Sequence, residues 1–160
     1  MNTKFTFAFC IVLFLGTANL ITACSLENGV KKQIKTSSAS DRSPFSQGIE
    51  ANGFVFLSGT LGTDPITGSL SGDDVVSQLT QIVKNLSDVL KEAGCTINDV
   101  VKATVFLTDM NNYAVMNEAY LTLFQAPYPA RTCVEVSALP RAGALIEVEV
   151  IAVKAKGISP

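Results

Sequence analysis

The sequence predicts one α+β domain in which two helices cover a single face of a β-sheet. Two stretches with helical apolar periodicity alternate with strand-like stretches, in the order strand, helix, strand, helix, strand, strand. A length of 160 residues favours one domain. The formal net charge of -2 provides no basic excess, so composition does not indicate a nucleic-acid-binding protein.

The chain contains no histidine, which excludes Ser-His-Asp and Cys-His catalysis and removes a main zinc ligand. Its four cysteines form no C-x-x-C pair, and no EF-hand spacing is present. We therefore expect no metal site.

Residues 1–23 predict a lipoprotein signal peptide. Lys4 precedes an apolar run from 5 to 21, and two small residues then lead into Cys24. This ending resembles a bacterial lipobox, so we expect Cys24 to be lipidated and to anchor an exported protein that faces the periplasm. The alternatives are an ordinary signal peptide cut nearby, or an uncleaved anchor, since the run of about 17 residues is short for a bilayer span.

Residues 24–36 read as a polar tether with a possible first strand, and 37–156 as the folded domain. Pro44 and Gly48 predict a loop over 41–48. Residues 53–60 are apolar on both faces and predict a central strand, followed by a turn at 64–68.

Gly59 lies near the end of that central strand. A glycine there permits close approach of a backbone or a ligand, although from this stretch alone a plain turn residue is the better explanation.

The clearest helix is predicted over 73–93, where apolar residues recur at three- and four-residue steps. Ser71 or Asp73 can cap its start, and Gly94 lies where a left-handed C-terminal cap belongs. We expect its apolar stripe to face the core and Cys95 to be a buried or half-buried thiol.

Alternation predicts a strand over 99–108, and a second helix follows at about 113–124. Prolines end that helix and lead into two final strands, 129–136 and 146–151, joined by a short loop.

The final two strands carry the chemistry. Alternation places Arg131, Cys133 and Glu135 on one face of the first strand. In the second strand, Glu147 and Glu149 lie opposite the apolar residues. If the strands adjoin and their apolar faces meet the core, an arginine, a thiol and carboxylates gather on the other side of the sheet, which indicates a site.

Two helices cover only one face of such a sheet, so the other face meets solvent or another subunit. It would carry Phe54 or Val55, Phe106, Leu145, Ile151 and Val153. So many apolar residues predict a closed homo-oligomer.

The motif Pro-Ala-Arg-Thr-Cys-Val-Glu-Val at 129–136, with Leu139-Pro140 and Ile-Glu-Val-Glu at 146–149, resembles the signature of the RidA (YjgF) family of enamine/imine deaminases. Supporting pieces are Pro-Phe-Ser-Gln-Gly at 44–48, Ser58-Gly59, Ala93-Gly94 and the strand 101–109. The resemblance runs from about Ser37 to Val153.

The resemblance implies a chorismate-mutase-like α+β fold and a homotrimer with three clefts between subunits. It implies hydrolysis of reactive 2-imino or enamine acids to 2-oxo acids and ammonia without a cofactor. The alternative is a non-catalytic trimeric lipoprotein that binds small carboxylates or holds unfolding clients.

In that reading Arg131 holds the substrate carboxylate with its planar fork. Its alternative is a structural salt bridge to Glu135 or Glu149. Glu147 positions or deprotonates the attacking water and passes a proton to the leaving amine, and its alternative is an exposed strand charge. Cys133 lends its backbone N–H and lines the pocket.

The opposite wall is expected from Ser58 and Gly59, with Phe45 where the family usually has tyrosine. Thr60 stands where glutamine is common, and the loop 141–145 is one residue longer than usual. The export signal is a further departure from the family pattern.

Overall fold

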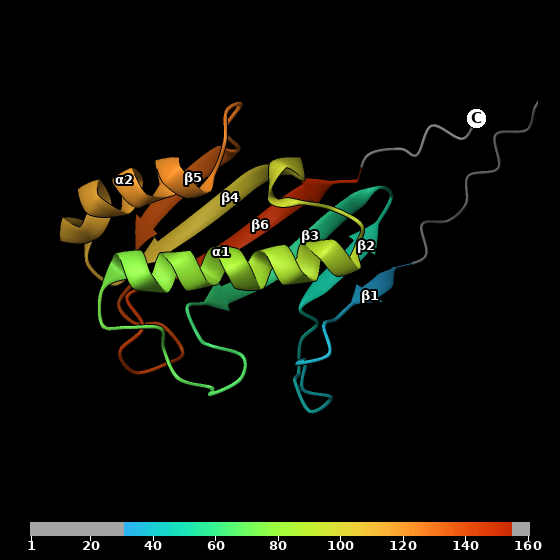
Figure 1. The fold of residues 1–160 in the computed structure, drawn as a ribbon, viewed down its shortest axis with the longest axis horizontal. Helices are drawn as coiled ribbons and strands as arrows, with labels where there is room; N and C mark the ends of the chain where they lie inside the picture. Colours follow the sequence, from blue (N-terminus) through green and yellow to red (C-terminus); the bar gives the residue numbers. More distant parts are fainter. Residues whose placement is uncertain (1–30, 155–160) are drawn as a thin grey trace, which may run out of the picture.

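The computed structural model describes residues 31–154 (Figure 1). The expected signal peptide and Cys24 lie outside this range. The elements are β1 (Lys32–Ile34), β2 (Gly48–Ala51), β3 (Phe54–Leu61), α1 (Val75–Glu92), the 3₁₀ turn η1 (Ile97–Asp99), β4 (Val100–Leu107), the 3₁₀ turn η2 (Met110–Asn112), α2 (Tyr113–Leu123), β5 (Ala130–Glu135) and β6 (Ile146–Val153).

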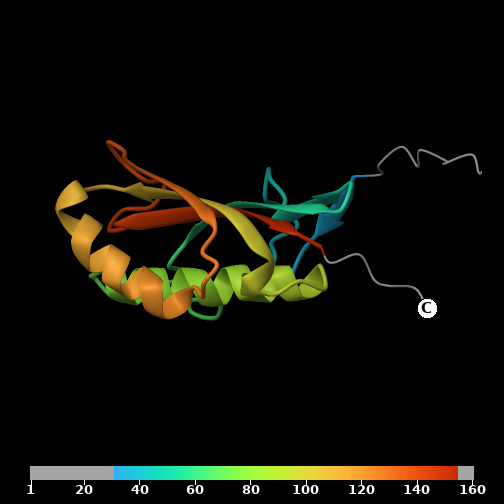
Figure 2. The same cartoon turned by 90° about the horizontal axis from the view of Figure 1, so that it is seen from above.

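The strands form one six-stranded sheet in the order β1-β2-β3-β6-β4-β5. All neighbours pair antiparallel except β4 and β5, which are parallel and connected through α2. Both helices lie against the same face of the sheet (Figure 2). The predicted α+β architecture, with two helices on one face of a mixed sheet, is therefore confirmed.

The prediction that the last two strands adjoin is wrong, because β4 lies between β5 and β6. The helical crossover from β4 returns the chain to a parallel position beside β4, as such crossovers do. The following strand, β6, then enters the gap between β3 and β4.

Helix α1 begins at Val75, later than either expected N-cap predicts. Asp74, rather than Ser71 or Asp73, is the N-cap, and its side chain accepts hydrogen bonds from the backbone N–H groups of Val76 and Ser77, each at 2.9 Å. Gly94 has φ +73° just beyond the helix, as the cap prediction requires.

Strand β2 was not predicted from the sequence. It forms a hairpin with β3 around Asn52 and Gly53, whose φ angles are 52° and 79°. Positive φ at both central residues is the geometry that Asn-Gly favours in two-residue hairpins. This dipeptide was the available signal. The weaker prediction of a first strand is confirmed by the short β1.

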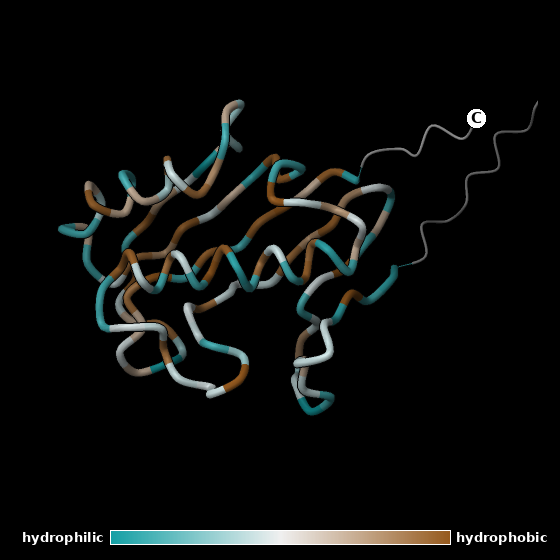
Figure 3. Tube along the Cα trace, viewed as in Figure 1, coloured by the Kyte–Doolittle hydropathy of each residue, from teal (hydrophilic) through white to brown (hydrophobic). Residues whose placement is uncertain are grey.

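The core lies between the helices and the sheet. Alternate residues of β4 and β6 are fully buried there, and Figure 3 shows largely hydrophobic strands behind α1. Cys95 is buried as expected. Within residues 31–154, neither helix has the length and hydropathy needed to span a bilayer.

The opposite sheet face, here called the open face, carries apolar side chains that no other element of residues 31–154 covers. They include Phe54 (45 % exposed), Phe56 (43 %), Val134 (40 %) and Val153 (39 %). Of the two alternatives, Phe54 lies on this face, whereas Val55 is buried in the core. So large an uncovered apolar surface is typical of an interface.

Candidate active site

Arg131 on β5 points toward α2, on the helix-covered face of the sheet. Its Nη2 donates a 2.5 Å hydrogen bond to Oδ1 of Asn117, and its guanidinium lies 4.6 Å from the centroid of the Tyr120 ring. Met116 Sδ lies 3.8 Å from Nη1, and the Tyr113 ring is 6.0 Å away. All of these partners are neutral.

No ion pair to Arg131 occurs within residues 31–154. Glu135, one of its expected structural partners, instead accepts a 2.7 Å hydrogen bond from the backbone N–H of Met110. Glu149, the other expected partner, lies on the opposite face of the sheet, because it is exposed and the residues on either side of it in β6 are buried. Arg131 therefore holds a partly buried positive charge without a carboxylate, which favours binding of an external anion.

Cys133 lies two residues along the same strand and packs against the core. It is half-buried, and this burial raises the pKa of its thiol, with Arg131 acting in the opposite direction. A raised pKa keeps the thiol protonated at neutral pH and opposes a nucleophilic role. Cys133 is not among the residues that line the pockets described below, so its expected part as a pocket wall stays a prediction.

Glu147 lies on the open face near the start of β6, where it pairs with Leu61 of β3 and Phe106 of β4. Desolvation by burial, followed by the charge of Glu149, raises the pKa of the Glu147 carboxyl above its ordinary value. A carboxylate whose ionised form is disfavoured is a stronger base than that of an ordinary glutamate, which suits it to accept and return a proton.

Gly59 explains how the Glu147 carboxylate is seated. Strand β3 has a register irregularity between Leu57 and Thr60, and Gly59 lies within it. A Cβ atom placed on Gly59 would overlap Oε1 of Glu147 and lie 2.9 Å from its Cδ. The close approach predicted for this glycine is therefore made by a carboxylate of the same chain, and a plain turn role is excluded.

Ser58 and Phe45 line a pocket beside Glu147, and their expected role in binding substrate stays a prediction. Its wall comprises Phe45, Ser58, Gly59, Leu61, Thr63, Pro140 and Glu147. The Ser58 hydroxyl donates to the backbone carbonyl of Ser46 at 2.7 Å, and the Ser58 N–H donates to the carbonyl of Gln47 at 3.0 Å. Ser58 thus holds the loop that carries Phe45.

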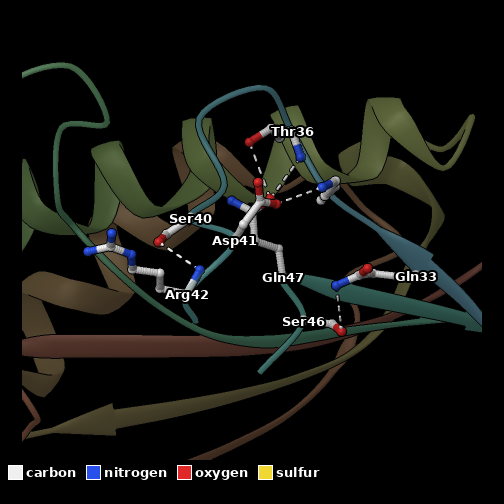
Figure 4. A network of polar contacts seen from close by, with 8 residues as sticks. Gln33, Thr36, Ser40, Asp41, Arg42, Ser46 and Gln47 are labelled. Atoms are coloured by element: carbon white, nitrogen blue, oxygen red, sulfur yellow. Dashed lines mark hydrogen bonds and ion pairs between the residues drawn. The ribbon is translucent and has the colours of Figure 1, made fainter. Parts of the chain in front are cut away.

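That loop is braced by polar contacts (Figure 4). Gln47 Oε1 accepts hydrogen bonds from the Thr36 backbone N–H at 2.8 Å and from its hydroxyl at 3.2 Å. Gln33 Nε2 donates to Ser46 Oγ at 3.1 Å. These bonds tie β1 to the start of β2, which fixes the loop whose Phe45 side chain is 61 % exposed.

The loop before β6 is anchored by a buried glutamine that the sequence did not single out. Gln78 donates to the carbonyls of Gly143 (3.0 Å) and Gly72 (3.2 Å) and accepts from the Leu145 N–H (2.9 Å). These bonds fix the strand start that carries Glu147.

The prediction that Arg131, Cys133, Glu147 and Glu149 gather on one side of the sheet is wrong. Arg131 and Cys133 face the helices, because Arg131 contacts α2 and Cys133 packs against the core, whereas the two glutamates alternate with buried residues of β6 and face the open side. Arg131 pairs with Ala103, three residues from the β4 residue that pairs with Glu147. Two strand spacings and three residues place the Cα atoms about 14 Å apart.

The candidate site therefore consists of two half-sites. The carboxylate half-site is the pocket around Glu147, defined above. The arginine half-site is lined by Asn117, Tyr120, Leu121, Tyr128, Pro129 and Arg131. They share no residue, and the residues described include no cluster of side chains suited to bind a metal ion.

The sequence pattern did not single out Asn117, which accepts a hydrogen bond from Arg131, and the four-residue spacing of Met116 and Tyr120 is more typical of core residues than of ligand contacts. Both are indeed buried, yet both also contact Arg131. A polar residue between buried ones in a helix was the signal for Asn117.

A single mixed sheet with two helices on one face defines a small α+β protein, and its unpaired arginine and desolvated carboxylate define a candidate site for an anion. The chain matches the Endoribonuclease L-PSP family model over residues 36–154 and belongs to that family, which includes the RidA/YjgF proteins.

Its relatives include the mouse 2-iminobutanoate/2-iminopropanoate deaminase, which is 44 % identical over 126 residues, covering 78 % of this chain and 93 % of that protein. The RutC family protein PH0854 of Pyrococcus horikoshii is 46 % identical over 111 residues, covering 69 % and 87 %.

Solved structures of related proteins have the same fold. The Rid family protein YyfA of Yersinia pestis has a TM-score of 0.72 at 44 % identity, covering 77 % of this chain and 98 % of that one. E. coli TdcF with bound serine has a TM-score of 0.71 at 37 % identity, covering 78 % and 100 %.

Proposed function

We propose that this protein is a cofactor-independent deaminase that hydrolyses 2-imino and enamine acids to 2-oxo acids and ammonia. Relatives such as the mouse protein carry the name of this activity. The observation that carries the proposal is the presence, in two separate half-sites, of an arginine without a carboxylate partner and a desolvated carboxylate of raised pKa. One binds an anionic substrate, and the other exchanges protons.

The reaction requires little beyond these groups. Arg131 binds the substrate carboxylate through two parallel N–H donors. Glu147 accepts a proton from the attacking water and passes it to the leaving amine, a contribution of about two to four decades in rate. The Cys133 backbone N–H and the Ser58–Gly59 segment form walls that hold the C=N bond in place.

Because the two half-sites lie on opposite faces of one sheet, we propose that each catalytic cleft forms between two copies. The arginine half-site of one subunit meets the carboxylate half-site of its neighbour. The exposed apolar residues of the open face supply the contact surface, and a closed homotrimer with three equivalent clefts satisfies both halves of every chain.

Phe45 keeps the aromatic wall but offers no hydroxyl, so we expect it to contact the substrate side chain through packing alone. The longer loop 141–145 is tied to α1 by Gln78, which retains Glu147 in register with β4. Thr60 directs its hydroxyl to the Ser58 carbonyl at 3.0 Å, within its own strand.

A second candidate is a non-catalytic trimer that binds a small carboxylate in the same clefts. The serine bound to TdcF, a structure 37 % identical to this chain, favours this reading. It predicts Arg131-dependent binding without turnover.

We also propose that the protein is exported, lipidated at Cys24 and anchored to a membrane facing the periplasm, from the residues of the signal-like segment. Replacing Cys24 with alanine should release the protein from sedimented membranes. A variant that still sediments would contradict lipidation.

The deaminase proposal is tested by mixing residues 25–160 with an amino acid oxidase, which generates imines, and following 2-oxo acid release. We expect acceleration that Arg131→Ala abolishes while the oligomer persists. No acceleration, or acceleration that Arg131→Ala leaves unchanged, contradicts the proposal.

A further inference from the structure

The partners of Arg131 have a common property. They are an amide oxygen, a thioether and two aromatic rings, and none carries a charge. The shortest contact is the 2.5 Å hydrogen bond from Nη2 to Oδ1 of Asn117. A half-buried arginine usually acquires a carboxylate partner, because desolvation of an unpaired charge is costly.

Asn117 is well suited to hold Arg131 without neutralising it. Its amide oxygen fixes one edge of the guanidinium, while the face of the Tyr120 ring, at 4.6 Å, restrains the plane. An aspartate of the same shape would accept the same hydrogen bond, and more strongly. It would also pair with the charge that a substrate carboxylate needs.

We propose that Asn117 is a positioning residue that orients Arg131 while keeping its charge available to the substrate. The inference rests on the proposed binding of a substrate carboxylate by Arg131. It adds a requirement for a neutral acceptor at this position of α2.

The test compares Asn117→Asp with Asn117→Ala, using 2-oxobutanoate and its uncharged amide as probes in titration calorimetry. Opposite charges within about 4–6 Å of each other interact strongly enough to shift a pKa by one to three units. The carboxylate introduced by Asn117→Asp would offset the positive charge of Arg131 by an interaction of this size, so it should weaken 2-oxobutanoate binding about tenfold or more. Binding of the amide should change less than about threefold. Asn117→Ala keeps the charge but loses the orientation, so it should weaken 2-oxobutanoate binding by a smaller factor, about three- to tenfold.

The matched control is Thr122→Asp, which adds the same charge at an exposed position of α2. It should leave 2-oxobutanoate binding unchanged, and that result would exclude a general electrostatic effect of the added negative charge. Thermal unfolding adds a second readout. If Asn117 only stabilises the fold through its hydrogen bond, Asn117→Asp keeps that bond and should be both stable and fully able to bind 2-oxobutanoate.

Asn117→Asp that binds 2-oxobutanoate like the wild type overturns the inference, as does a wild type that shows no Arg131-dependent binding. Imine turnover is measured separately. Wild-type binding that Asn117→Asp weakens, in the absence of turnover, would support the inference and contradict the deaminase proposal.

Discussion

Replacing Gly59 with alanine should separate the activity of this protein from its stability. The added methyl group would overlap Oε1 of Glu147 and lie 2.9 Å from Cδ and 3.4 Å from Cγ. All three atoms belong to one flexible side chain, so the carboxylate must move while the strand stays in place. Gly59 does not have a left-handed φ, and its backbone therefore accepts alanine.

The expected loss of activity is large and the expected change in stability is small. Moving a reacting group by about 1 Å costs about a hundredfold in rate. Pushing Glu147 off its rotamer costs about 0.5–1.5 kcal/mol, whereas the stiffer unfolded chain contributes about 0.4–1 kcal/mol in the other direction. The free energy of unfolding should therefore remain within about 1 kcal/mol of the wild-type value.

The assay is kcat/KM for 2-oxo acid release, measured beside urea denaturation. Gly53→Ala is the matched control, since its φ is +79° and no atom lies within 4 Å of the added Cβ. It should lose about 1–2 kcal/mol of stability and keep its activity. Wild-type kcat/KM in Gly59→Ala would refute the reasoning, as would a further loss when Gly59→Ala is added to Glu147→Gln.

Three further predictions concern the carboxylate half-site and the glutamine that braces it. Because burial and Glu149 raise the pKa of Glu147, activity that needs its ionised form should rise with pH above the range of an ordinary glutamate, and Glu147→Gln should abolish this rise. A raised folded-state pKa destabilises the native state once the group ionises, so Glu147→Gln should also be more stable than the wild type at neutral pH, with the difference vanishing in acid. Gln78→Ala removes three hydrogen bonds from a fully buried side chain and should lower the free energy of unfolding by about 3 kcal/mol in urea, while a loss below about 1 kcal/mol would contradict the bracing role.

Local patterns predicted nearly every element of this fold, because helix periodicity, caps and strand alternation are properties of adjacent residues. Strand order is not such a property. The adjacency of β5 and β6 was predicted wrongly since nothing within either strand specifies its neighbour, whereas the α2 crossover places β5 parallel to β4.

The face of β5 was also misjudged for a physical reason. Apolar Val134 was expected to point to the core, yet it is 40 % exposed on the open face, and Arg131 lies under α2 instead. Alternation reveals which residues share a face, but it identifies the core only when one face is apolar and the other polar. Here both faces are partly apolar, which agrees with the proposed trimer, in which helices cover one side of the sheet and neighbouring subunits would cover the other.

Subunit mixing provides the sharpest test of a shared cleft. Arg131→Ala and Glu147→Gln should each be inactive as homotrimers, since every cleft lacks one group. If the proposed trimer is correct, each mixed trimer contains one cleft with an intact arginine half-site and an intact carboxylate half-site. Random reassembly of equal amounts makes about three quarters of the trimers mixed, so activity should recover to about one quarter of wild type. If Arg131 and Glu147 acted within one chain, reassembly would restore no activity. That result would refute the proposal that the two groups meet in a cleft between subunits.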